Sequence, residues 1–163
     1  MKLIKVVSSL LFVAVVPNAF SDTGTAINKT DLIGSWNCTH EFVEPSTKML
    51  INVDYKTNFI ANGNAYGSGD LFFTIEGMPK INYKASDNST WSLKGDELTI
   101  KSKNINFTNV SHPQLDKFLD IKKILPASIN ESGKLTTLTS NKLTVKSNSY
   151  GKSYSCTKVA SAQ

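Results

Sequence analysis

Apolar and polar residues alternate along most of the chain, which is the pattern of β-strands with one buried face. The alternation is clearest from Lys48 to Phe59, where Ile51 and Val53 are separated by polar residues. Seven other segments repeat the pattern with turn residues between them, so we expect about eight strands. The other predicted strands are 34–43, 65–76, 81–94, 98–107, 134–139, 143–148 and 152–159.

One segment has a different period. From Pro113 to Leu125 the apolar residues recur mostly at spacings of three and four, which predicts a helix that Pro113 opens and Pro126 ends. A short helical turn is expected from Thr30 to Ile33, with Thr30 or Asp31 as its cap. The fold class is therefore mainly β and antiparallel, with one inserted helix near 113–125.

The first residues have the pattern of an export signal. Lys2 and Lys5 precede an apolar run from Val6 to Val16, and small residues follow as far as Ser21. The run is too short to cross a bilayer as a helix, which takes ~20 apolar residues. We therefore expect a signal peptide at 1–21, a flexible leader at 22–30, one domain at 31–160 and no integral membrane segment after cleavage.

The charge of the chain argues against nucleic acid as a partner. The formal charge is +5, and loss of Lys2 and Lys5 with the signal lowers it to +3. All the basic residues are lysines, scattered along the chain, and there is no arginine. Nucleic-acid readers use clustered basic residues and arginine for bidentate contacts.

The two cysteines, Cys38 and Cys156, are separated by nearly the whole mature chain. In an exported protein this pattern predicts one structural disulfide and an oxidising compartment, either periplasmic or extracellular. If the cysteines face each other on antiparallel strands, Trp36 faces Lys158 and His40 faces Tyr154. The first strand then lies beside the last, which closes the sheet into an up-and-down barrel.

The segment Leu32-Ile33-Gly34-Ser35-Trp36 resembles the Gly-X-Trp signature on the first strand of lipocalins and related calycin-type bacterial domains. The resemblance implies an eight-stranded barrel whose closed end holds Trp36 beneath a basic residue from near the C-terminus. Lys158 is the matching residue, and the disulfide register reaches it independently. The barrel-closing motif is thus Gly34, Trp36 and Lys158. The lysine replaces the family's usual arginine, and the predicted helix precedes the last three strands.

No pattern indicates catalysis. The histidines His40 and His112 stand apart in sequence, and nucleophile, phosphate-binding and metal-binding motifs are lacking. His40 has inward parity and is expected to be a core or rim histidine. We expect no enzyme activity, no catalytic residue, no metal and no cofactor.

Two functions remain open for a non-enzymatic barrel. The first is binding of a small hydrophobic or amphipathic ligand in the interior, and a filled core is equally consistent with the same aromatic residues. The second is a protein-binding module, such as a periplasmic inhibitor or immunity protein, that presents loops such as 61–70 and 87–90 to an exported protein. The candidate cavity residues have inward parity and are Tyr55, Phe59, Phe73, Tyr83 and Trp91.

Overall fold

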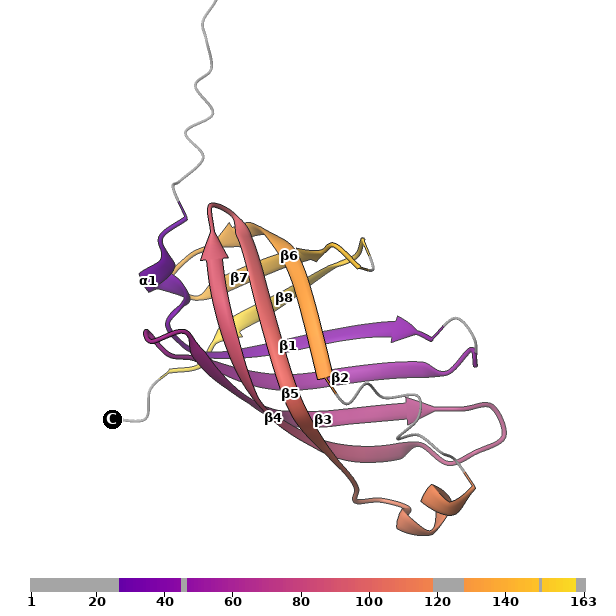
Figure 1. The fold of residues 1–163 in the computed structure, drawn as a ribbon. Coiled ribbons are helices and arrows are strands. Elements are labelled where there is room, and N and C mark those ends of the chain that lie inside the picture. The colour runs from indigo at the N-terminus through magenta and orange to yellow at the C-terminus, as the bar shows by residue number, and fades with distance from the viewer. Residues whose placement is uncertain (1–26, 45–46, 119–127, 150, 161–163) are drawn as a thin grey trace, which may run out of the picture.

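A computed structural model of the chain describes residues 27–44, 47–118, 128–149 and 151–160. Within these ranges eight antiparallel strands form a closed barrel, in which each strand pairs with the next and β8 pairs with β1 (Figure 1). The predicted fold class is confirmed. The expected signal peptide at 1–21 lies outside the described residues, as does most of the leader at 22–30.

Residues 110–127 join β5 to β6, the other connections are of six residues or fewer, and two short helical elements accompany the strands. The helices are α1 (Lys29–Leu32) and the 3-10 helix η1 (Pro113–Lys117). The strands are β1 (Gly34–Val43), β2 (Leu50–Phe59), β3 (Asn64–Thr74), β4 (Ile81–Lys94), β5 (Glu97–Asn109), β6 (Ser128–Leu138), β7 (Lys142–Ser147) and β8 (Ser153–Lys158).

The cysteines form the disulfide, and they set the register that the sequence predicted. Cys38 pairs with Cys156 across β1 and β8, and Trp36 pairs with Lys158. The ladder ends at Thr39 and Ser155, but the next inward pair still meets, since the His40 and Tyr154 ring centroids are 5.3 Å apart. The register therefore holds along the whole inward face of this seam.

Three polar segments differ from the prediction. The expected loop at 87–90 lies inside the continuous strand β4, where only a β-bulge against β5 between Ser86 and Asn88 interrupts the pairing. The β6 strand begins at Ser128 instead of 134, because its polar first residues pair with β5. Most of the expected loop 61–70 is likewise part of β3. Backbone pairing extends these strands beyond the alternating pattern.

The inserted helix is confirmed only at its start. Residues from Pro113 to Lys117 form a 3-10 helix, and residues 119–127 lie outside the described part of the chain. The first short helix is capped by Asn28, whose side chain accepts from the Thr30 backbone N–H at 3.0 Å, and not by Thr30 or Asp31.

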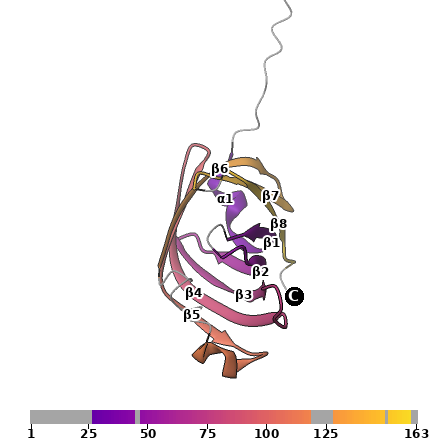
Figure 2. The ribbon, with the colours of Figure 1, turned by 90° about the vertical axis from the view of Figure 1, so that its right-hand side faces the viewer.

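One end of the barrel, which we name the closed end, carries α1 and the β2–β3, β4–β5 and β6–β7 connections (Figure 1). Seen along the barrel from the opposite end, α1 lies within the ring of strands (Figure 2). Trp36 has no exposed surface, and its indole N–H donates to the Leu32 carbonyl oxygen at 2.7 Å. The Lys158 ammonium lies 5.1 Å from the indole centroid and donates to the Asp31 carbonyl oxygen at 3.0 Å.

The same contacts explain the glycine of the Gly-X-Trp segment. Gly34 has a φ of +117°, which an L side chain rarely adopts, and a Cβ there would lie 3.1 Å from Cε of Lys158. The predicted barrel-closing motif of Gly34, Trp36 and Lys158 is therefore brought together at the closed end.

Candidate functional site

The five aromatic residues predicted to line a cavity do not form one group. Phe59 and Trp91 meet edge to face at 5.5 Å in the apolar cluster of the closed end. Phe73 and Tyr83 meet edge to face at 5.3 Å in a second apolar cluster, toward the opposite end. Only Tyr55 stands between the two clusters. The part these residues have in ligand binding stays a prediction.

The first of these clusters fills the closed end. The indole N–H of Trp91 is shared between the carbonyl oxygens of Ile60 and Asn64, both at 3.0 Å, and the Lys29 ammonium lies 4.9 Å from the ring centroid. Each tryptophan thus has its N–H satisfied and a lysine over its ring. The described side chains of this end are packed together as core.

A polar layer separates the two apolar clusters, and it is built around Tyr55. The Tyr55 ring lies against the wall of the barrel, because Gly67 and Gly69 on the neighbouring strand have no side chains in its path. A Cβ at Gly67 would lie 2.7 Å from the Tyr55 hydroxyl oxygen, and a Cβ at Gly69 would lie 2.8 Å from the ring. The ring therefore reaches across β3, and its hydroxyl donates to Asp87 on β4.

Asp87 extends this layer toward β5. Its second carboxylate oxygen accepts from the Ser89 hydroxyl, which lies 2.7 Å from the hydroxyl of Ser102. Burial and the adjacent Asp87 carboxylate raise the pKa of the Tyr55 phenol well above its ordinary value. At neutral pH Tyr55 is therefore a hydrogen-bond donor and Asp87 is its acceptor.

A second inward carboxylate belongs to Glu131 on β6. It accepts from the Ser147 hydroxyl and, at 2.9 Å, from the Ser149 hydroxyl. Burial and, second, the charge of Glu131 raise the pKa of Tyr154 to about 12. In the described part of the chain neither Asp87 nor Glu131 forms an ion pair with a lysine. The interior layer therefore carries negative charge.

His40 completes the layer on β1. Its ring packs 5.3 Å from Tyr154 and 6.0 Å from Phe42, and burial lowers its pKa below the ordinary value. Its Nδ1 atom is buried and makes no hydrogen bond to any described residue. His40 is a neutral interior histidine, as its parity predicted.

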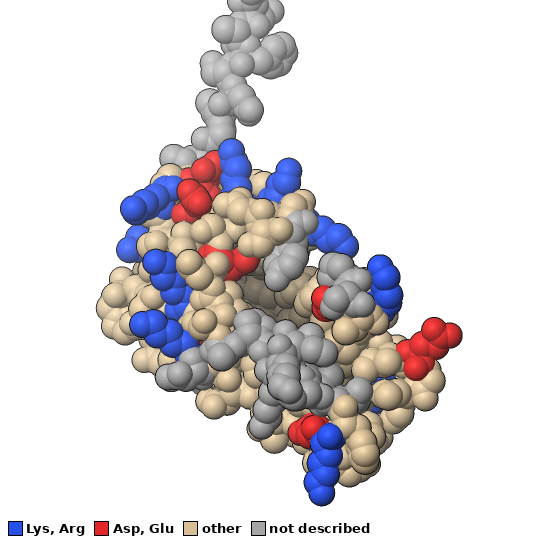
Figure 3. Space-filling model, turned by 45° about the vertical axis from the view of Figure 1, so that its right-hand side comes forward, with Lys and Arg blue, Asp and Glu red and all other residues tan. Residues whose placement is uncertain are grey.

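The polar layer is only partly buried: its serines Ser89, Ser102 and Ser147 are buried, but its larger members are not. Tyr55, Asp87 and Glu131 all keep part of their surface accessible, whereas inward residues of the closed end, such as Trp36 and Phe59, have almost none. Figure 3, which turns the end opposite α1 toward the viewer, shows a hollow in this face of the molecule. The middle of the barrel is therefore reachable by solvent.

The η1 segment is fastened beside the second apolar cluster. The Tyr83 hydroxyl donates to Asp116, and the Asn109 amide N–H donates to Asp116 Oδ1 and to the His112 carbonyl oxygen, each at 2.8 Å. Burial and the Asp116 contact raise the pKa of Tyr83. His112 thus belongs to the connection that leads into η1.

No group of three or more potential metal-binding side chains occurs among the described residues. No helix within those residues is long and apolar enough to cross a membrane. The disulfide is compatible with an oxidising compartment.

The fold and the interior define a class: a closed, eight-stranded antiparallel barrel, consistent with a calycin-like fold, that has one solid end and a polar layer. No protein-family model matches the chain, and no curated protein matches it in sequence. The likeness to lipocalins therefore rests on the barrel and on Gly34, Trp36 and Lys158.

Sequence reasoning missed most of the polar layer. Asp87 and Ser89 were assigned to an expected loop at 87–90, although they alternate in phase with Tyr83 and Trp91 on the same strand. The available signal was the pair Gly67 and Gly69, which occupies two inward positions of a strand and so indicates a close approach by another group. Glu131 fell outside the predicted strands, and its inward parity could not be assigned.

Proposed function

We propose that this protein is an exported, non-enzymatic binding protein that takes a small amphipathic molecule into the barrel. The observation that carries the proposal is the half-buried polar layer between two apolar clusters. The apolar part of such a ligand would lie against inward side chains of the second cluster, such as Val53 and Leu71, which are themselves only half-buried.

The charge of the interior narrows the ligand further. Asp87 and Glu131 accept hydrogen bonds from hydroxyl groups and have no described cation beside them. A ligand with an ammonium or other donor group gains an ion pair or hydrogen bond there, whereas a carboxylate or phosphate meets like charge. We therefore expect a cationic or hydroxyl-bearing amphiphile instead of a fatty acid.

Native mass spectrometry of the protein purified from its own compartment is the direct test, with a bound small molecule as the expected result. A head-group series completes it: dodecylamine, dodecanol and dodecanoate share one tail, and the amine should bind most tightly. Asp87→Asn should weaken the amine complex, and Asp54→Asn, on the exposed outer face of β2, should not. The proposal is contradicted if the purified protein carries no small molecule and none of the three probes binds to it.

A second candidate, a protein-binding module, is favoured by apolar side chains exposed near the end opposite α1. Val43 ends β1, Met78 lies between β3 and β4, Val110 follows β5, and Phe118, which is 82% exposed, follows η1. The expected partner is one exported protein captured in stoichiometric amount. Met78→Asp and Phe118→Asp should abolish capture while Asp87→Asn leaves it intact; the reverse pattern would favour the interior site.

A further inference from the structure

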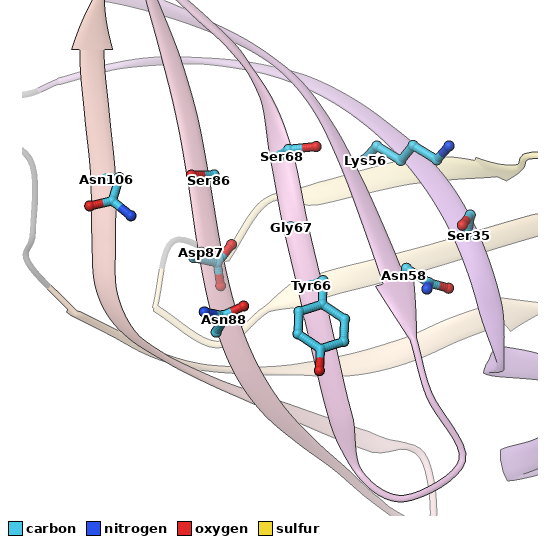
Figure 4. Close-up of a pocket in the computed structure, with 10 residues that line it drawn as sticks. All are labelled: Ser35, Lys56, Asn58, Tyr66, Gly67, Ser68, Ser86, Asp87, Asn88 and Asn106. Atoms are coloured by element: carbon cyan, nitrogen blue, oxygen red, sulfur yellow. The ribbon is translucent and has the colours of Figure 1, made fainter.

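A second hollow lies on the outer face of the barrel, across β2, β3, β4 and β5, with Ser35 of β1 at one edge (Figure 4). It has a volume of about 470 Å³, within the usual range for sites that bind small molecules. Most of its side chains come from alternate, outward positions, on the opposite face of the sheet from the polar layer; Gly67 and Asp87 have inward parity, and Asp87 is the residue shared with that layer. The lining residues are Ser35, Lys56, Asn58, Tyr66, Gly67, Ser68, Ser86, Asp87, Asn88 and Asn106.

The strand register explains why this face is hollowed. Ser68 pairs with Ser86, so two short side chains stand side by side on the middle strands. Tyr66 pairs with Asn88 on one side of them, and Asp70 pairs with Lys84 on the other, which gives longer side chains on both flanks. A neighbouring hollow on the same face shares Ser68, Ser86 and Asn106 with it. The two hollows therefore form one groove, which has serines at its floor.

The outward side chains of the groove are polar and nearly uncharged, and Asp87, a carboxylate in its lining, accepts hydrogen bonds from Tyr55 and Ser89 on the inner face of the sheet. Asn58, Asn88 and Asn106 place three carboxamides around it, and none of these side chains forms a hydrogen bond with another described residue. The Lys84 ammonium is held by Asp70 at 2.7 Å, which leaves Lys56 as the free cation among the described lining residues. An anionic polymer would need more positive charge, and a lipid would need apolar walls.

The chemistry of the lining residues matches a neutral saccharide. A carboxamide and a serine hydroxyl each both donate and accept, as a sugar hydroxyl does. The Tyr66 ring is 50% exposed at the edge of the groove and offers an aromatic face to the C–H side of a sugar ring. We propose that the outer groove of β2–β5 is a binding site for a neutral oligosaccharide, separate from the interior site.

The test begins with the full chain on an array of neutral and sulfated oligosaccharides. The best neutral binder is then titrated into ¹⁵N-labelled protein, or chitotriose and maltotriose if none stands out. Amide shifts should concentrate on the outward positions around Ser68 and Ser86. Shifts confined to inward positions, binding to sulfated glycans alone, or no binding to any of these probes would overturn the proposal.

Matched variants on one strand separate the groove from the rest of the surface. Ser86→Arg fills the floor of the groove and should abolish binding, whereas Ser92→Arg, an exposed serine on the same strand outside the groove, should leave it unchanged. Tyr66→Ala should weaken binding about tenfold. Equal binding by wild type and Ser86→Arg, with both folded by circular dichroism, would also overturn the proposal.

Discussion

Glycine is required at Gly67 by a side chain on another strand, not by a turn. Tyr55 lies across β3 only because residues 67 and 69 have no Cβ, and the hydroxyl reaches Asp87 as a result. The polar layer therefore depends on the absence of a Cβ atom at positions 67 and 69. Substitution of Gly67 tests whether the Tyr55 ring can occupy another position.

We expect Gly67→Ala to lower the free energy of unfolding by about 1–3 kcal/mol, since the new methyl group overlaps Tyr55 and Asp87. Urea denaturation measures the loss. In a Tyr55→Ala background the same substitution should cost much less, because the ring that it overlaps is gone. An equal cost in both backgrounds would mean that Tyr55 does not occupy this space.

His40 gives the interior a predictable response to pH. Burial lowers its pKa in the fold, so between that value and its ordinary pKa of ~6.5 the unfolded chain binds more protons. The stabilisation that neutral His40 contributes is fully present above the pKa that His40 has in the unfolded chain. It is lost as the pH falls through this window. The rings of Tyr154 and Phe42 pack against His40, and Val53 is its partner on β2.

Melting temperatures measured from about pH 8 to about pH 5 test this response. The wild type should lose more stability across the window than His40→Gln. His112→Gln serves as the control and should follow the wild-type curve. Identical pH profiles for wild type and His40→Gln would contradict an effect of burial on His40.

At the scale of elements, α1 and the end of β8 cooperate to seal the barrel. Lys158 spans both, since its ammonium lies over Trp36 and also donates to the carbonyl oxygen of Asp31. We expect Lys158→Ala to destabilise the fold by about 1 kcal/mol, against less than about 0.5 kcal/mol for the exposed Lys142→Ala. Thermal or urea unfolding compares the two. Equal losses would remove the support that Lys158 gives to the lipocalin-like likeness.

Strands in which apolar and polar residues alternate without a break could be predicted from the sequence. Segments that are strands only because they pair with a neighbouring strand could not. The β1 and β4 strands were predicted with the boundaries they have, because apolar residues mark every second position along most of their length. The β6 strand begins with Ser128, Ile129 and Asn130, whose strand state comes from hydrogen bonds to β5. The outer groove escaped prediction for a similar reason, since its residues meet only through the register of four strands.

At the scale of the whole molecule, closure of the barrel depends on a short seam. The register pairs four positions of β1 with β8, against ten of β1 with β2. The Cys38–Cys156 disulfide lies within those four pairs and joins positions 118 residues apart in sequence. A covalent bond therefore reinforces the shorter of the two strand pairings that β1 makes.

We expect Cys38→Ser to lower stability by ~4–5 kcal/mol on the chain-entropy model and to leave Cys156 open to alkylation once the seam opens. Hydrogen exchange should accelerate first at the amides shared by β1 and β8 and much less at those between β3 and β4, because the long hairpins do not need closure to stay paired. An unchanged melting temperature in oxidising buffer would mean that the bond is dispensable. Uniform acceleration across all strands would mean that the barrel opens only by global unfolding, and that the short seam is no weaker than the rest of the sheet.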